Sequence, residues 1–254
     1  MNGTKALRIE TVCKSFDLGS AHVSVLESVS FDLDAGTWTT LLGPSGCGKT
    51  TLLKIISGLE TPDSGSVSIS GSRATQLGAT AYLPQLDTLL PWRTALGNAI
   101  LASEIDGKPL DVAKQEALAL FDHFGLSGFE AMYPSQLSGG MKQRLALIRT
   151  FLTRRSILLL DEPLGALDPL TRATLQKWLL GVWGELKKTV LLVTHDAEEA
   201  LLLSDRILVL TERPAQLQWE QTVDLPRPRD RGSRPLVEQK SQLLDLLLKE
   251  GASV

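Results

Sequence analysis

Three features of the sequence predict an α/β fold with parallel strands. The segment 37–42 (TWTTLL) has the composition of a strand; a glycine-rich loop follows it, and then TLLKIISGL has helical spacing. Four aliphatic residues at 157–160 precede two acids, and another apolar run, VLLVT, ends just before His195. Because such runs suit strands buried on both faces, we expect a parallel sheet whose carboxyl edge carries the polar groups.

The loop after the first strand, GPSGCGKT, has the pattern of a phosphate-binding loop. Its three glycines let the backbone curl so that successive N–H groups point at phosphate oxygens, next to the positive end of a helix that starts near Lys49. Lys49 is expected to reach the β- and γ-phosphates, and the Thr50 hydroxyl to ligate Mg²⁺. The alternative is a glycine-rich turn with an incidental lysine. The candidate phosphate-binding residues are Gly43, Pro44, Ser45, Gly46, Cys47, Gly48, Lys49, Thr50 and Thr51.

Two acids follow the aliphatic run ILLL, at the edge of the sheet where ligands of open α/β sheets bind. Asp161 is placed to hold the Mg²⁺ shell. Glu162, one residue further and so directed differently, is placed to polarise the attacking water. The alternative is a solvated acidic pair that caps the strand before Pro163.

The segment 137–144, LSGGMKQR, indicates a second anion site. Ser138, Gly139 and Gly140 precede the helical pattern MKQRLALIRTFL, so they offer a hydroxyl and accessible N–H groups at a positive helix end. Without further context, a plain helix cap is the favoured interpretation of these residues.

Three histidines are present, and one of them follows a predicted strand. His195 comes between VLLVT and the acidic start of a helix, DAEEALLL, and therefore belongs to the same sheet edge. His22 and His123 have no such setting, and we expect both at the surface.

The composition predicts a chain with a sizeable core. Of its 254 residues, 43% are apolar and 22% charged; the net charge is -3, and nothing in this balance suggests a nucleic-acid partner. No apolar run approaches the roughly 18 residues of a membrane span, and the N-terminal segment lacks the apolar stretch of a signal peptide. Two cysteines, Cys13 and Cys47, are too few for a disulfide framework and fit a reducing compartment.

These motifs occur in the order found in the ATP-binding subunits of ABC transporters, which the chain resembles over nearly its whole length. GPSGCGKT matches the Walker A loop, LSGGM the signature and ILLLDE the Walker B strand. Gln85, in AYLPQ, matches the Q-loop, GALD at 165–168 the D-loop, and His195 the switch histidine. Phe16 matches the aromatic residue that stacks on adenine. The resemblance implies an ABC-type ATPase with a P-loop NTPase (RecA-like) core.

The resemblance also implies the roles of individual residues around ATP and Mg²⁺. Glu162 and His195 would be catalytic, with the histidine contacting the γ-phosphate and steadying the attacking water. The metal shell would include Thr50, Gln85 and Asp161, and Gln85 would sense the transmembrane partner from a joint between two subdomains. The nucleotide would further contact Phe16, Gln85, Asp168 and, from a second copy in a head-to-tail dimer, Ser138, Gly139 and Gly140.

The motifs also organise the chain into subdomains. Alternating segments at 7–33 and 65–72 are expected as short strands of an antiparallel β subdomain, and 37–60, the strand before Gln85 and 155–211 as the α/β core. The ABC ATPase domain would span 1–225, with a helical signature subdomain at about 86–153. Residues 226–254 would form a connector and an amphipathic helix.

The C-terminal helix is predicted to be amphipathic. Val237, Leu244 and Leu248, with Leu243 and Leu247, are expected on one face. We expect this face to pack on its own subunit; binding a partner is the alternative.

Group-level likenesses narrow the family further. LDTLLPWRTALGNAI resembles a segment of the nitrate, sulfonate and taurine importers, and LSGGM, GALD, THDAEEALLLSDRI and VDLPRPR fit that group. Gly97 and Leu164 depart from it, since the group usually has glutamate and phenylalanine there. The resemblance implies an ATP-hydrolysing subunit that powers uptake of nitrate, a sulfonate, taurine or a similar solute. The alternatives are a thiamin-precursor importer and a P-loop ATPase outside transport.

The partners implied by the resemblance are proteins. They are transmembrane permease subunits, a second ATPase subunit in a homodimer and, indirectly, a periplasmic or extracellular solute-binding protein. The chain would then lie at the cytoplasmic face of the cell membrane, attached peripherally through the permease. An apolar patch after the Q-loop, made of Leu89, Leu90, Pro91 and Trp92, is expected to receive a short helix of the permease, unless Trp92 belongs to the core.

Overall fold

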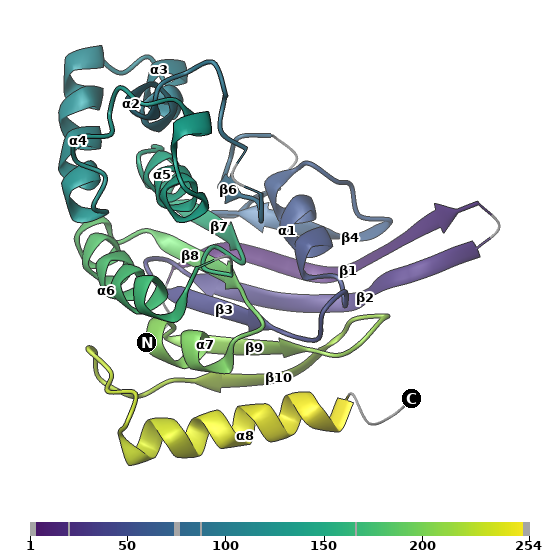
Figure 1. Ribbon diagram of the computed structural model, residues 1–254. Coiled ribbons are helices and arrows are strands. Elements are labelled where there is room, and N and C mark those ends of the chain that lie inside the picture. The colour runs from purple at the N-terminus through teal and green to yellow at the C-terminus, as the bar shows by residue number, and fades with distance from the viewer. Residues whose placement is uncertain (1–3, 20, 74–76, 87, 166, 251–254) are drawn as a thin grey trace. The chain divides into compact units, whose positions relative to one another are not determined.

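The computed structural model describes residues 4–19, 21–73, 77–86, 88–165 and 167–250 (Figure 1). The chain divides into two compact units. The first unit comprises residues 1–80 and 187–254, and the second comprises residues 81–186. Each unit is described by itself.

The first unit contains an antiparallel sheet with the strand order β2-β1-β4-β5. Two long strands form most of it, where the sequence pattern had predicted short ones. Irregular register explains the difference: the pairing of β1 with β2 shifts between Ile9 and Lys14, and these bulges interrupt the period-two alternation. The strands are β1 (Lys5–Leu18), β2 (Ala21–Asp34), β4 (Ser64–Ile69) and β5 (Ser72–Arg73).

The same unit contains four further strands in the order β10-β9-β3-β8. Strand β3 pairs in parallel with both β8 and β9, as the apolar runs predicted, and β10 is antiparallel to β9. All residues of β3 and β8 are buried. The elements are β3 (Trp38–Leu42), α1 (Lys49–Ser57), β8 (Thr189–Val193), α7 (Ala197–Leu203), β9 (Arg206–Leu210), β10 (Leu217–Thr222) and α8 (Arg234–Glu250).

The second unit combines two parallel strands with helices. Strand β6 pairs with β7, and Tyr82 lies opposite Leu159. The helical spacing predicted over 93–153 corresponds to four α-helices and one 3₁₀ turn. The elements are β6 (Ala81–Leu83), α2 (Ala95–Ala99), α3 (Leu101–Ile105), α4 (Leu110–His123), η1 (Pro134–Gln136), α5 (Gly139–Phe151), β7 (Ile157–Asp161) and α6 (Pro169–Leu186).

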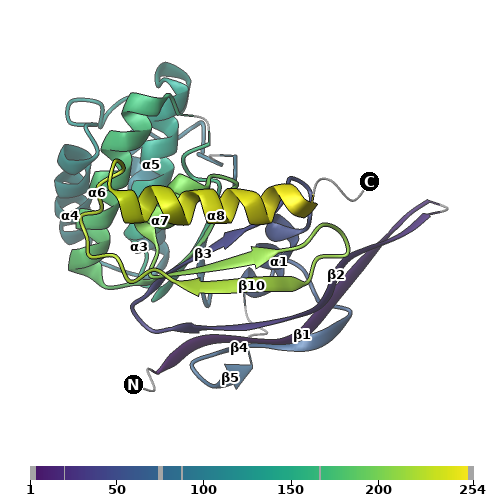
Figure 2. The same ribbon diagram turned by 90° about the horizontal axis from the view of Figure 1, so that it is seen from below.

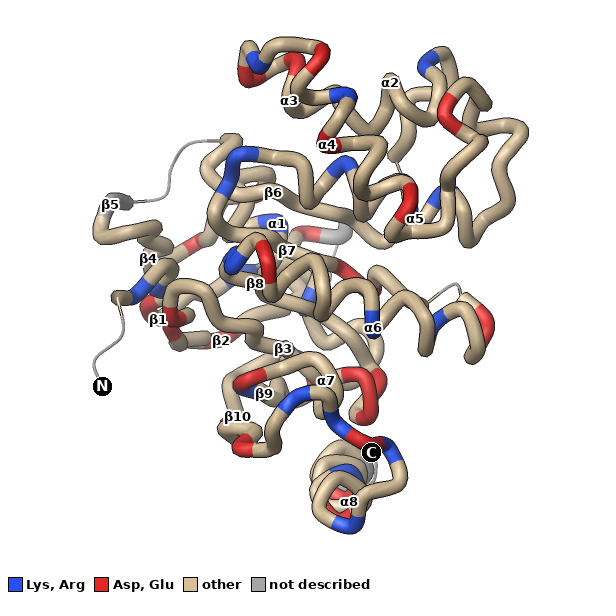
Figure 3. The backbone as a smooth tube through the Cα atoms, turned by 90° about the vertical axis from the view of Figure 1, so that its left-hand side faces the viewer, with Lys and Arg blue, Asp and Glu red and all other residues tan. Residues whose placement is uncertain are grey.

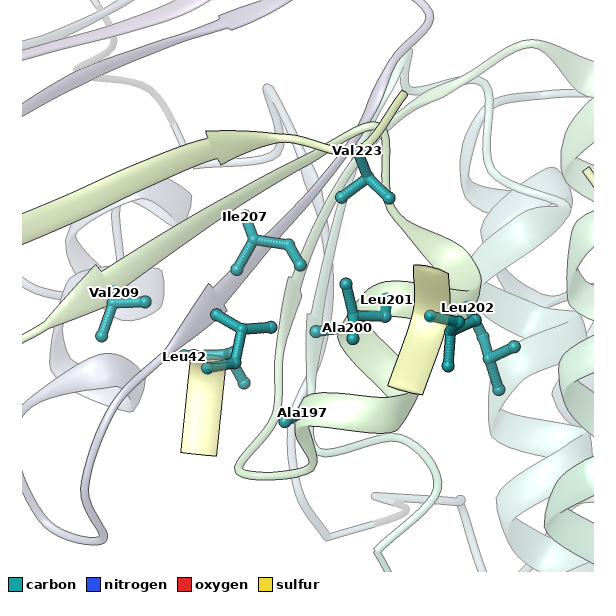
Figure 4. Packing of buried hydrophobic residues seen from close by; sticks show 10 residues of the cluster. Leu42, Ala197, Ala200, Leu201, Leu202, Ile207, Val209 and Val223 are labelled. Carbon is teal, nitrogen blue, oxygen red and sulfur yellow. The ribbon is translucent and has the colours of Figure 1, made fainter. Parts of the chain in front are cut away.

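The C-terminal helix α8 packs on its own unit, beside α7 (Figure 2). Leu236 and Leu243 are fully buried in a hydrophobic cluster. Figure 4 labels other members of this cluster, among them Ala200 and Leu201 of α7 and Leu42, the residue before the phosphate loop. The predicted apolar face is wrong at two positions, because Val237 and Leu244 are 48% and 41% exposed. The helix has apolar residues over a wide arc, and the half around Leu236 and Leu243 faces the core.

Ion pairs also join the C-terminal segment to α7. Basic and acidic residues are interspersed along the chain (Figure 3). Glu198, in the first turn of α7, accepts from Lys240 of α8 at 2.5 Å and lies 3.5 Å from Arg231 of the connector. The carboxylate therefore holds both the connector and α8 against α7.

Two arginines of the connector cap the carboxyl end of α7. The Arg229 guanidinium donates to the carbonyls of Leu201 at 2.5 Å, Ser204 at 2.6 Å and Val223 at 3.1 Å. Burial, and secondly the charge of Arg227, lower the pKa of Arg229 to about 10. Arg227 donates to the Leu203 carbonyl at 2.5 Å. Cations suit this end of a helix, so the connector stabilises α7.

Leu243→Ala should lower the free energy of unfolding by about 2–4 kcal/mol, because it removes a fully buried side chain from the cluster under α7. The neighbouring Leu244→Ala should cost less than about 1 kcal/mol, because Leu244 is partly exposed. Urea denaturation of both variants measures the difference. Equal costs for the two substitutions would show that α8 does not pack through the Leu243 face.

Candidate functional site

In the first unit, parallel pairing brings the phosphate loop and His195 to the same sheet edge. Leu41 of β3 lies opposite Val193 of β8, and the Thr194 N–H donates to the Leu41 carbonyl at 3.4 Å. The loop begins two residues after Leu41, and His195 follows two residues after Val193. The predicted grouping of these two motifs is therefore observed.

The phosphate loop requires glycine where it enters helix α1. Gly48 has φ 127°, a conformation that other residues rarely adopt. A Cβ atom there would lie 2.9 Å from Val25 Cγ1 and from Leu26 Cδ2 of β2. These close approaches fix the loop against β2.

Lys49 points back into its own loop. Its side chain is buried, and Nζ donates to the carbonyls of Gly43 and Pro44, each at 2.8 Å. An ammonium held inside a curled backbone provides the positive charge that phosphate oxygens require, so the loop fits an anion of this kind. Ser45, Gly46 and Thr50 are exposed.

The segment around His195 is held from both sides. His195 itself is exposed. Before it, the buried Thr194 hydroxyl donates to Glu199 Oε2 at 2.5 Å. After it, Asp196 caps α7 by accepting from the N–H groups of Glu198 at 2.8 Å and Glu199 at 3.2 Å. These bonds fix the backbone on which the imidazole stands.

The candidate adenine-stacking residue, Phe16, lies near the end of the β1–β2 hairpin. It is half-buried and pairs with Val23 of β2. The Lys14 ammonium lies 5.0 Å from the centre of its ring. His22, also in this hairpin, is exposed, as is His123, which confirms both as surface residues.

In the second unit, a second pair of parallel strands brings Gln85 and Glu162 together. Leu83 of β6 lies opposite Leu160 of β7, and Gln85 and Glu162 each follow one of these paired residues by two positions. Gln85 Nε2 donates to Glu162 Oε2 at 3.4 Å. Glu162 has φ 46°, which is uncommon for a residue with a side chain and which sets the direction of its carboxylate.

Asp161 differs sharply from its neighbour. It is buried, and its Oδ2 accepts a hydrogen bond from the Tyr82 hydroxyl at 3.2 Å. Burial, with the adjacent Asp161 charge, raises the pKa of Tyr82, so the phenol remains a donor. An inward carboxylate next to a more exposed one suits the division between a cation ligand and a water-polarising group.

The sequence did not point to Tyr82. It precedes Gln85 by three residues in a short strand, and only the register of β6 with β7 places its hydroxyl on Asp161. No sequence pattern reports that register, so the contact required the structure.

The signature segment begins a helix as predicted. Ser138 caps α5 by accepting from the Met141 N–H at 3.3 Å, and Ser138 and Gly139 are exposed. Gln143 Nε2 donates to the Pro163 carbonyl at 2.8 Å, and a Cβ at Gly140 would lie 3.2 Å from Leu167 Cδ2. The start of α5 therefore packs on the segment that follows Glu162.

The D-loop residue Asp168 is exposed and caps α6. It accepts from the N–H groups of Leu170 at 3.2 Å and Thr171 at 3.0 Å. Hydrogen bonds from Thr171 lower the pKa of the Asp168 carboxyl. Ala166, within the same predicted motif, lies outside the described residues.

The loop after Gln85 presents an exposed tryptophan on a fixed backbone. Trp92 is 71% exposed, so it does not belong to the core. The buried Asn98 side chain holds this loop: its Oδ1 accepts from the Leu90 N–H at 2.8 Å, and its Nδ2 donates to the Arg93 carbonyl at 3.0 Å. Of the four residues in the predicted patch, Leu89 is buried, Leu90 is half-buried, and Pro91 and Trp92 are exposed.

Comparison with known proteins agrees with this geometry. The family model described as ABC transporter matches residues 26–165, more than half of the chain. The chain belongs to the ABC transporter ATP-binding family.

Two relatives show how far this similarity extends. The chain is 40% identical over 237 residues to the aliphatic sulfonates import ATP-binding protein SsuB of Bacillus cereus, covering 93% of each chain. It is 46% identical over 195 residues to the formylaminopyrimidine import ATP-binding protein ThiZ of Halalkalibacterium halodurans, covering 77% of this chain and 76% of that one.

A solved structure of an ABC cassette has the same fold. The cassette MJ0796, described as a dimer in a post-hydrolysis state bound to ADP and Pi, matches with a TM-score of 0.77 and 28% identity, covering 87% of this chain and all of that one. The predicted P-loop NTPase core with an antiparallel β subdomain and a helical signature subdomain is confirmed. As a member of this family, the chain is an ATP-binding ATPase.

Within the ranges that the structure describes, no helix is long and apolar enough to cross a membrane. In the same ranges, no group of three or more His, Cys, Asp and Glu side chains is arranged to hold a metal ion.

The two cysteines should differ in reactivity. Burial raises the pKa of the Cys47 thiol, whereas hydrogen bonds from Ser64 and from the Ser28 N–H lower the pKa of Cys13. Since the thiolate reacts, the alkylation rate of Cys47 should rise only at a higher pH than that of Cys13. Rate–pH profiles of Cys13→Ser and Cys47→Ser, each retaining one thiol, measure this order.

Bound nucleotide should also slow the alkylation of Cys47, because this thiol lies inside the phosphate loop. MgATP should leave the Cys13 rate unchanged, which provides the control. Faster reaction of Cys47 than of Cys13 at neutral pH would contradict the burial of Cys47.

Proposed function

We propose that this ATPase is the energy-supplying subunit of an importer that carries a small solute through separate membrane permease subunits. One observation carries this proposal: Gln85 and Glu162 meet at the carboxyl edge of two parallel strands, directly before a loop that presents Trp92. The hydrogen bond from Gln85 thus links Glu162, the proposed water-polarising carboxylate, to a loop suited to contact a protein partner. The relatives named as import ATP-binding proteins give further support.

The phosphates of ATP would bind in the loop 43–51. Lys49 now donates to the Gly43 and Pro44 carbonyls. When ATP binds, its phosphate oxygens would take the place of these carbonyls as acceptors, and they would also accept from the loop N–H groups. The half-buried ring of Phe16 would stack on adenine. Lys49 and the loop backbone thereby orient the γ-phosphate for in-line attack.

The acidic residues and His195 would act on the water that attacks the γ-phosphate. Glu162 would polarise this water, and His195 would steady it and contact the γ-phosphate. Asp161, Gln85 and Thr50 offer a carboxylate, an amide and a hydroxyl oxygen, which suit Mg²⁺, since this ion is usually held by one or two carboxylates together with substrate phosphates. When bound, Mg²⁺ would neutralise charge that develops on the phosphates.

The signature segment would act on the ATP of a second copy. Ser138 and Gly139 are exposed at the start of the 13-residue helix α5, where a hydroxyl, N–H groups and the helix dipole favour an anion. In a head-to-tail homodimer, Ser138, Gly139 and Gly140 would cap the γ-phosphate held by the partner, with Asp168 nearby. ATP would then join two subunits, and hydrolysis would separate them.

The permease would dock on the loop after Gln85. Pro91 and Trp92 are exposed, and the Asn98 hydrogen bonds hold the backbone beneath them. A fixed, exposed tryptophan suits a short apolar helix from a membrane subunit. Docking here would place the chain at the cytoplasmic face of the cell membrane.

The solute classes that we propose follow from the relatives and the group resemblance. Aliphatic sulfonates and formylaminopyrimidine are the solutes in the names of the two relatives. Nitrate and taurine complete the set that the resemblance suggests. The solute itself would be selected by the permease and by a solute-binding protein outside the membrane.

Two substitutions separate binding from hydrolysis. Lys49→Ala should weaken ATP binding by about tenfold or more, because it removes the ammonium from the phosphate loop. Glu162→Gln should bind ATP normally but lose turnover by more than about 100-fold, because an amide does not polarise water as a carboxylate does. Fluorescent-nucleotide binding and phosphate release measure the two effects. Unaltered turnover in Glu162→Gln would remove Glu162 from its proposed role.

A further inference from the structure

The loop between β9 and β10 contacts the phosphate loop through an arginine. Arg213 Nε donates a hydrogen bond to the Gly46 carbonyl. A Cβ placed on Gly46 would lie 3.7 Å from an Nη atom of Arg213, so the guanidinium lies across this part of the loop. The two residues are 167 positions apart in the chain, and both belong to the first unit.

The loop that carries Arg213 is fixed at both its ends. The Thr211 N–H donates to the Gln216 carbonyl at 3.0 Å, and the Gln216 N–H to the Thr211 hydroxyl at 2.9 Å, which closes the loop on itself. Its buried residue Ala215 pairs with β2: the Ala215 N–H donates to the Val25 carbonyl at 2.9 Å, and the Ala215 carbonyl accepts from the Glu27 N–H at 3.0 Å. Arg213 therefore projects from a rigid support.

The same part of β2 also limits the phosphate loop. Val25 and Leu26 are the residues that a Cβ at Gly48 would meet at 2.9 Å. Strand β2 thus contacts the phosphate loop at Gly48 and supports the loop that holds Gly46. A change in the position of one loop relative to the other would strain both contacts.

The hydrogen bond from Arg213 has a directional consequence for the phosphate loop. In a trans peptide the C=O and the next N–H point in opposite directions, so a partner on the Gly46 carbonyl directs the Cys47 N–H to the other side. That N–H now donates to the Pro44 carbonyl at 3.3 Å, and Lys49 Nζ donates to the same carbonyl. The Cys47 N–H and the Lys49 ammonium therefore converge inside the loop.

Gly46 itself does not fix this orientation. It has φ 79°, in a region that glycine enters readily and leaves readily, so the peptide after it needs an outside contact to stay in place. A charge-assisted hydrogen bond to the outward carbonyl provides such a contact.

We propose that Arg213 is a positioning residue of the phosphate loop, which holds the Gly46–Cys47 peptide with its N–H directed at the bound phosphates. The inference rests on the proposed role of 43–51 as the phosphate site and adds to it a residue from the β9–β10 loop. Arg213 acts through the Gly46 carbonyl and lowers the cost of ordering the loop when nucleotide binds.

The test compares wild type with Arg213→Ala, using the fluorescent nucleotides mant-ATP and mant-ADP with Mg²⁺. We expect both dissociation constants to rise by the same factor, about tenfold, because the loop contacts phosphates that ATP and ADP share. At saturating ATP, kcat should keep at least about half of its wild-type value, so the loss appears in KM. A role limited to overall stability would not produce this split.

Arg8→Ala is the matched control. Arg8 is an exposed arginine of β1 in the same unit, 4.0 Å from Glu10, and its removal should leave nucleotide affinity unchanged. If Arg213→Ala does not fold, Arg213→Lys serves in its place, because lysine keeps the charge without the planar guanidinium. This variant should also bind both nucleotides more weakly than wild type. Wild-type affinity for both nucleotides in the folded variant would overturn the inference.

Lys49→Ala distinguishes this failure from failure of the proposed function. If Lys49→Ala loses nucleotide and Arg213→Ala does not, the phosphate site stands and only the role of Arg213 is overturned. If Lys49→Ala binds mant-ATP as wild type does, the assignment of 43–51 fails, and the inference fails with it.

Discussion

Parallel strand pairing is the constraint on which the rest of the site depends. Neighbouring parallel strands end at one edge, so residues that follow paired positions by the same number of residues must lie close together. This occurs twice: β3 with β8 aligns the phosphate loop with His195, and β6 with β7 aligns Gln85 with Glu162. The buried runs that form these strands thus determine which polar residues meet. In β8 and in residues 157–160 these runs are themselves apolar except for Thr189.

The segments packed around the phosphate loop and His195 limit how this sheet edge moves. The connector arginines and α8 stabilise α7, the helix that begins just after His195, and Leu236 and Leu243 share a hydrophobic cluster with Leu42 at the base of the phosphate loop. On the other side of the loop, β2 and Arg213 contact Gly48 and Gly46. In the proposed phosphate site, rigid support of this kind would keep Lys49 and the loop N–H groups arranged before nucleotide binds, which would reduce the entropy lost on binding.

Much of the site was predictable because each motif adjoins a strong local pattern. The apolar runs before Gly43, Asp161 and His195 indicated buried strands, and Ser138 before MKQRLALIRTFL indicated a helix start; the structure has a strand or a helix at each place. These signals are local, since composition and spacing within about ten residues carry them.

The contacts that the sequence did not reveal are long-range. Tyr82 and Asp161 are 79 positions apart, and Gly46 and Arg213 are 167 apart, so each depends on register and on loop conformation rather than on any neighbouring pattern. The apolar face of α8 was predicted wrongly at Val237 and Leu244 for a related reason. These residues and Leu243 all belong to a wide apolar arc, and only packing against α7 decides that Leu243 is the buried one.

In the proposed dimer, the signature of one copy completes the ATP site of the other. Light scattering of Glu162→Gln, with and without MgATP, tests it most directly, because this variant should bind nucleotide without hydrolysing it. The mass should change from the 27.6 kDa of one chain to twice that value on adding MgATP, and this change should be lost when Ser138→Arg is added. ATP binding with the mass unchanged at one chain would contradict the account.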